Sequence, residues 1–239
     1  PARLTLPLST DEISNAGGDT CGPGDTATIA TALRLSCNIP FAQLGLVLGE
    51  DTLARYTEAF GFGTAFEVPM TATPSSFPTG LDDAQLMLSS FGQYDVRVTP
   101  LQMALVSAAI ANGGNLMQPT LLDRIIAPDL SIVQQSEPTL FSQPITRVTA
   151  ETVSALMVDA VSNGVASNAR IEGVAVAGKT GTAENGDTAP YTLWFTGFAP
   201  ADNPQVAVAV VIEDGGGLGQ SGSSNRIAAP IAKRVFEAV

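Results

Sequence analysis

Histidine is absent from this 239-residue chain, and only two cysteines are present. Without an imidazole, a Ser-His-Asp or Cys-His catalytic site and a histidine-based zinc site are excluded. Two cysteines are too few for a structural zinc site, and no carboxylate cluster has metal-ligand spacing. We therefore expect no metal and no cofactor. Any nucleophile must be activated by another base, for which lysine is the usual substitute.

Positive charge is also scarce. Lysine and arginine together number 11 against 23 aspartates and glutamates, which gives a net charge of −12. Such a surface repels phosphates, so we expect no nucleic-acid partner. The chain is 45% hydrophobic and only 14% charged, a balance typical of a folded globular domain with a sizeable core.

Long apolar runs and a signal peptide are both missing. The first residue is Pro1 rather than methionine. We expect a piece of a longer polypeptide, or a processed or cloned segment, in which any membrane or targeting segment lies upstream.

Periodicity and turn residues predict helices in the first two thirds and strands in the last third. The predicted helices cover 26–35, 40–49, 51–60, 100–111, 149–161 and 226–239, and the predicted strands cover 3–8, 173–183, 190–199 and 204–213. We expect loops at 15–26 and 62–84, and short extended pieces at 115–147. The short link between the last two strands favours an antiparallel hairpin. This order indicates an α+β fold.

Two short motifs could carry chemistry. The stretch GVAVAGKTGTAENG, residues 173–186, places Lys179 just after the alternating apolar residues 174–177 of a predicted strand. Alone, it fits a strand end with a solvated lysine. Ser36-Cys37-Asn38 interrupts a helical region, and alone it fits a helix cap or turn. The two motifs together, in this order, are much more specific.

In that combination the chain resembles the penicillin-binding proteins, serine acyltransferases with the motifs S-x-x-K, S-x-N and K-T-G. The stretches RVTPLQMALVSAAIANGG (97–114), GKTGTAE (178–184) and WFTGFAP (194–200) strengthen the likeness. It covers essentially the whole chain and is closest to actinobacterial class B members of the penicillin-binding protein A type. The 143 residues from Ser36 to Lys179 (179 − 36) suit a transpeptidase better than a class A β-lactamase.

The resemblance implies a serine β-lactamase/D,D-transpeptidase-like fold, an antiparallel sheet flanked by helices. It also implies roles for motif residues. Ser36 resembles the proton shuttle to the leaving group, and Asn38 the holder of the substrate amide and catalytic lysine. Lys179 supplies positive charge for the substrate carboxylate and for the proton network.

The residues after this lysine would bind substrate. The hydroxyls of Thr180 and Thr182 would contact the same carboxylate, and Gly181 would let the substrate lie against the strand. By resemblance, the backbone N–H of Thr182 is one of two oxyanion-hole donors.

The chain departs from the family because S-x-x-K is absent: the residues three before its two lysines are Val176 and Pro230. We expect residues 1–239 to be the C-terminal part of one transpeptidase domain, with the N-terminal part of the fold, including the nucleophilic serine, upstream. This chain alone should then not be acylated.

The resemblance implies a parent D,D-transpeptidase that cross-links peptidoglycan stem peptides ending in D-Ala-D-Ala and binds β-lactam antibiotics. It would act outside the cytoplasm, anchored to the membrane only through a segment absent from this chain. Two alternatives stay open: a non-catalytic β-lactam sensor of the same fold, and a serine β-lactamase.

Cys21 and Cys37 fit either two buried thiols or a disulfide. We favour the disulfide, because the chemistry that the family implies takes place where thiols oxidise, and because pairing leaves no cysteine over.

Overall fold

The computed structural model describes residues 1–24 and 26–239, so Asp25, within the predicted loop 15–26, lies outside the described residues. Its centre is a three-stranded antiparallel sheet in the order β7-β8-β9. The strands are β7 (Ala177–Ala183), β8 (Thr192–Ala199) and β9 (Val206–Ile212). The predicted α+β fold and its C-terminal hairpin are confirmed. β7 begins four residues later than predicted and forms an edge of the sheet.

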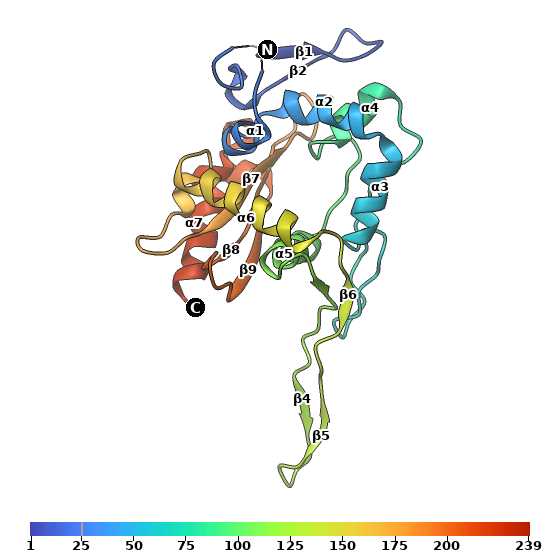
Figure 1. Ribbon diagram of the computed structural model, residues 1–239, viewed down its shortest axis with the longest axis vertical. Coiled ribbons are helices and arrows are strands. Elements are labelled where there is room, and N and C mark those ends of the chain that lie inside the picture. Colours follow the sequence, from blue (N-terminus) through green and yellow to red (C-terminus); the bar gives the residue numbers. More distant parts are fainter. Residues whose placement is uncertain (25) are drawn as a thin grey trace.

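Helices cover both faces of this sheet (Figure 1). α7 (Ser224–Glu237) packs on one face, where Phe195 of β8 lies among buried alanines of the helix. α5 (Pro100–Ala111) and α6 (Arg147–Ser162) pack on the other, where Phe198 of β8 contacts the two helices' apolar side chains. Successive residues of a strand face opposite sides, so β8 contributes to both cores.

Local signals set the starts of the two helices under the sheet. The Thr99 side chain accepts a hydrogen bond from the Gln102 N–H, and Pro100 occupies the first turn of α5, as predicted. Thr146 caps α6 in the same way, so that helix begins two residues before the predicted Thr149.

The N-terminal half forms an arc beside the sheet (Figure 1). Its elements are the β1–β2 hairpin (Arg3–Thr5 and Glu12–Ser14), α1 (Ile29–Leu35), α2 (Asn38–Leu48), α3 (Glu50–Ala59) and α4 (Asp83–Ser89). Several predicted bounds need correction. β1 ends at Thr5 rather than Leu8, and α1 begins at Ile29 rather than Thr26, because the Thr28 side chain caps it. α2 begins at Asn38 rather than Pro40, and α4 starts inside the region expected to be irregular, because Asp82 and Gln85 form a capping box.

Short strands fill residues 116–142, in agreement with the predicted extended pieces. β3 (Leu116–Met117) pairs with β6 (Leu140–Ser142), and β4 (Arg124–Ile126) pairs with β5 (Ile132–Gln135). The β4–β5 hairpin, residues 124–135, projects away from the body (Figure 1); we call it the arm. Short 3-10 helices occur at Ala16–Gly18, Ser167–Ala169, Asp214–Gly217 and Gly219–Ser221. No helix within the described residues has both the length and the apolar character to cross a membrane.

Candidate active site

A cleft of about 720 Å³ runs along β7. The junction of α1 and α2 lines it together with the turn after β2 and the start of α7. The predicted site residues Ser36, Asn38, Thr180, Gly181 and Thr182 all line it. The remaining predicted residue, Lys179, joins them through a hydrogen bond from its Nζ to the Ser36 Oγ, 2.6 Å long. Motifs 143 residues apart therefore meet at the edge of the sheet.

Lys179 is partly buried and bound by neutral oxygens. Its ammonium donates to the Ser36 Oγ and, over 2.7 Å, to the backbone carbonyl of Thr180. Burial removes water from the ammonium and lowers the pKa of Lys179 from 10.5 to about 8. In the described part of the chain no carboxylate forms an ion pair with Lys179. The charge is thus available to an anionic ligand.

Ser36 holds an unusual backbone conformation. It ends α1 with φ 56° and ψ 47°, in the left-handed region, where residues other than glycine and asparagine are disfavoured. Cys37 then occupies the N-cap position of α2, so Asn38 is the first residue of that helix. The break between the helices places both the hydroxyl and the amide at the cleft. Strain of this kind concentrates at functional sites.

The predicted disulfide is confirmed: Cys21 and Cys37 are joined, with their Cα atoms 5.9 Å apart. Both residues are buried. The bond ties the middle residue of Ser-x-Asn to the glycine-rich loop that precedes α1.

Polar contacts hold the same motif from the other side. The Asn38 side chain donates to the Ser14 carbonyl over 2.9 Å, so its amide is anchored to β2. The buried Asn15 side chain accepts from the Ile39 N–H over 3.0 Å and donates to two backbone carbonyls. Asn15 was not singled out from the sequence, where it is one residue of a loop.

The two threonines of β7 lie on the opposite strand face from Lys179, because side chains alternate along a strand. Thr182 is exposed, and its Oγ1 lies 3.0 Å from the Oγ of the buried Ser224, at the start of α7. The Ser224 Oγ also donates to the Gly181 carbonyl over 2.5 Å. Ser224, like Asn15, has no motif that could have marked it.

Gly181 is not required by the fold. Its φ is not positive, and an added Cβ would make only an ordinary contact of 3.5 Å with the Trp194 Cβ. The open space above it belongs to the cleft. That Gly181 lets a substrate lie against the strand stays a prediction.

The family model for the penicillin binding protein transpeptidase domain matches residues 7–237. The chain belongs to this family. Penicillin-binding proteins are also its structural neighbours. It is 40% identical over 241 residues to the peptidoglycan D,D-transpeptidase PbpA of Mycolicibacterium smegmatis, a match covering 99% of this chain and 48% of that protein.

Solved structures of related proteins also match the fold of this chain. A ceftriaxone acyl-enzyme complex of penicillin-binding protein A from M. tuberculosis matches with a TM-score of 0.94 and 36% identity, over 99% of this chain and 54% of that one. The D,D-transpeptidase domain of a peptidoglycan glycosyltransferase from Eggerthella lenta matches with a TM-score of 0.86 and 32% identity, over 100% and 58%. The chain spans about half the length of the curated relatives that it matches.

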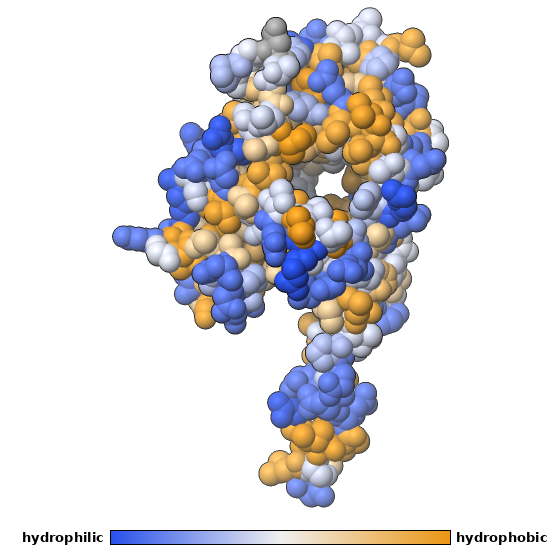
Figure 2. Space-filling view, in the orientation of Figure 1, coloured by the Kyte–Doolittle hydropathy of each residue, from blue (hydrophilic) through white to orange (hydrophobic). Residues whose placement is uncertain are grey.

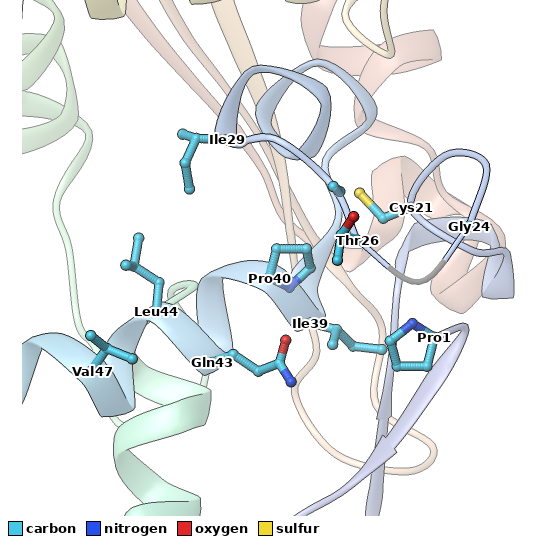
Figure 3. Close-up of a pocket in the computed structure, with 11 residues that line it drawn as sticks. Pro1, Cys21, Gly24, Thr26, Ile29, Ile39, Pro40, Gln43, Leu44 and Val47 are labelled. Atoms are coloured by element: carbon cyan, nitrogen blue, oxygen red, sulfur yellow. The ribbon is translucent and has the colours of Figure 1, made fainter.

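Two further features concern possible ligand sites other than the cleft along β7. Within the described ranges, no group of three or more histidines, cysteines or acidic residues could hold a metal ion. A separate cavity of about 310 Å³ lies between α1 and α2 (Figure 3). Ile29, Leu44 and Val47 turn toward the same open space there. Its lining is largely apolar, unlike that of the cleft along β7.

Proposed function

We propose that this chain is the C-terminal part of a D,D-transpeptidase domain. Its parent protein would cross-link peptidoglycan stem peptides by serine acyl transfer and be acylated by β-lactams. The observation that carries this proposal is the 2.6 Å hydrogen bond between Lys179 and Ser36 in a cleft at the open edge of β7. A cation, a relay hydroxyl and a free strand edge are what acyl transfer from an extended peptide requires.

Each group has a task in that reaction. A serine hydroxyl attacks the carbonyl carbon of the penultimate D-Ala, the C–N bond breaks, and the terminal D-Ala leaves after its amine gains a proton. Ser36 passes that proton, because its hydroxyl can accept from Lys179 and donate outward at once. Lys179 attracts the terminal carboxylate. The Thr182 N–H stabilises the oxyanion.

The attacking serine and its general base must come from outside these 239 residues, which contain no S-x-x-K. We propose that an apolar upstream helix carries them and packs against α2 and α5. Both helices are apolar around nearly their whole circumference, a pattern typical of buried helices. Yet Val47 is 83% exposed and Leu48 is 42% exposed. Figure 2 shows an opening through the molecule with hydrophobic residues along its rim.

Penicillin labelling tests the proposal. We expect the 239-residue chain to form no covalent adduct with a fluorescent penicillin, and the full-length protein that contains it to form one adduct per chain. Intact-mass spectrometry reads both. An adduct on the 239-residue chain would contradict the placement of the nucleophile. Full-length protein that has S-x-x-K and still takes up no penicillin would refute the proposed function.

A true loss of S-x-x-K would favour a second candidate, a non-catalytic β-lactam-binding domain of the same fold. Acylation and turnover of the full-length protein separate the two candidates. A transpeptidase is acylated by penicillin and releases D-Ala from a stem peptide in the presence of an acceptor amine, whereas a domain without the nucleophilic serine does neither.

We also propose that the domain acts outside the cytoplasm. The Cys21–Cys37 disulfide supports this location, because such bonds persist in oxidising compartments. A membrane anchor upstream of this chain is part of the same proposal.

A further inference from the structure

Gln93 reaches β7 from a distant part of the chain. It lies on the connection between α4 and α5, and its Nε2 donates to the Thr182 carbonyl over 3.0 Å. Its Oε1 accepts from the Glu184 N–H over 3.2 Å. Gln93 also lines the cleft. One side-chain amide therefore satisfies two backbone groups, one near the end of β7 and one directly after the strand, 89 and 91 residues further along the chain.

The turn that carries Gln93 is shaped for this contact. Gly92 and Tyr94 on either side both have positive φ, 89° and 62°. The Gln93 N–H donates to the Leu88 carbonyl at the end of α4. A non-glycine residue such as Tyr94 adopts positive φ at an energetic cost, so surrounding contacts must hold the turn in place.

The pairing reproduces that of an added strand. A neighbouring strand offers one N–H and one C=O per residue, and the Gln93 amide offers the same donor and acceptor. The Thr182 carbonyl and the Glu184 N–H belong to the two peptide planes on either side of Ala183. Because both are bound, neither plane is free to rotate, and the orientation of Thr182 is fixed from its C-terminal side.

We propose that Gln93 is a positioning residue. It holds Thr182 in the orientation that acyl transfer needs, and it ends the length of β7 edge open to a ligand strand. This inference rests on the proposed function. A carbonyl has two lone pairs, so the Thr182 carbonyl can still accept from an extended ligand that pairs along Lys179–Thr182. The single hydrogen of the Glu184 N–H is already donated to Gln93, so the ligand cannot slip by two residues toward Glu184.

Hydrogen exchange on the 239-residue chain tests the contact between Gln93 and Glu184 independently of any acylation. We expect Gln93→Ala to raise the exchange rate of the Glu184 amide by roughly tenfold, since its acceptor is lost. Gln93→Glu keeps an acceptor and should keep the Glu184 amide protected. Gln205→Ala is the matched control, because the side chain of that exposed glutamine bonds only to the nearby Asn203 and Pro204 carbonyls among the described residues.

Acylation of the full-length protein tests the role. We expect Gln93→Ala and Gln93→Glu each to lower the acylation rate constant for penicillin roughly tenfold, since small displacements of reacting groups cost about that much or more. Tm should change by less than about 2 °C, and Gln205→Ala should acylate normally. A merely structural role would lower Tm and leave the rate constant of the folded protein unchanged.

The outcomes are distinguishable. If the parent protein reacts with penicillin and Gln93→Ala reacts at the same rate, the inference is wrong and the proposed function stands. If the parent protein does not react, the proposed function fails. The exchange measurement then still decides whether Gln93 holds the edge, and unchanged Glu184 exchange in Gln93→Ala refutes it.

Discussion

Lys179 shows that the site is arranged for a ligand rather than for stability. The fold removes water from its ammonium and provides the Ser36 hydroxyl and the Thr180 carbonyl as acceptors. The lowered pKa of Lys179, about 8, records the cost of that burial. A bound carboxylate would offset it.

Lys179→Met should therefore stabilise the chain at pH 7 by about 2 kcal/mol, less than the full desolvation cost because two hydrogen bonds are lost. The pKa of Lys179 is lower in the folded chain than in the unfolded chain. The unsubstituted chain therefore gains stability as pH rises from about 8 toward 10.5. The advantage of Lys179→Met should shrink across that window. Urea unfolding at several pH values measures it, and a pH-independent difference would contradict the assignment.

Ser36 gives a second prediction at this scale. Ser36→Gly and Ser36→Ala both remove the hydroxyl that Lys179 contacts, so the two variants differ only in backbone preference. Because φ at Ser36 is 56°, Ser36→Gly should be more stable than Ser36→Ala by about 1 kcal/mol. Thermal unfolding compares them. Equal Tm values would mean that the left-handed conformation is not held.

At the scale of elements, the disulfide joins the break between α1 and α2 to the loop before them. Closing a 16-residue separation is worth about 3 kcal/mol in the chain-entropy model. Reduction, or the paired change Cys21→Ser with Cys37→Ser, should lower Tm by about 5–10 °C. Two free thiols in the unreduced, denatured chain would rule the bond out.

The arm, unlike the disulfide, should contribute little to the thermal stability of the chain. Every residue of β4 and β5 is exposed, and the two strands pack principally on each other. Replacing residues 124–135 by a two-residue Asn-Gly turn should change Tm by less than about 2 °C. It should also lower self-association, since Ile125, Ile132 and Val133 are exposed on an unpaired hairpin. Calorimetry and light scattering measure the two effects, and a large fall in Tm would show that the arm supports the body.

At the scale of the whole molecule, the apolar surface of α2 needs explanation. Ile39 of this helix is 1% exposed, while Val47 is 83% exposed. If the proposed upstream helix covers Val47, a polar residue at this position should cost little folding free energy in the 239-residue chain. It should cost more in the full-length protein, which contains the covering helix.

We expect Val47→Asn to change the stability of the 239-residue chain by less than about 0.5 kcal/mol and to lower its binding of a hydrophobic dye. In the full-length protein the same change should cost more than about 1 kcal/mol, because the side chain is then buried. Ile39→Asn, a matched control, should destabilise both. Equal, small effects of Val47→Asn in both polypeptides would contradict the proposed cover.

Signals contained within a few residues were readable from the sequence. Thr99-Pro100 determined where α5 begins, and the alternating run at 204–213 determined β9, because caps and strand patterns depend on neighbours along the chain. The two motifs and the paired cysteines were recognised through their resemblance to the family. The start of β7 was misplaced: an apolar run does not specify which of its residues find a pairing partner, and Val174 does not enter the sheet.

Tertiary structure alone decided the contacts between segments far apart in the chain. The sequence does not indicate that Gln93 binds Thr182, that Ser224 supports Gly181, or that Asn15 anchors the start of α2. Each of these polar residues looks like an ordinary loop or helix-start residue. Their partners depend on how helices and sheet pack, because a hydrogen bond requires two groups within about 3 Å, and only the folded chain sets that distance.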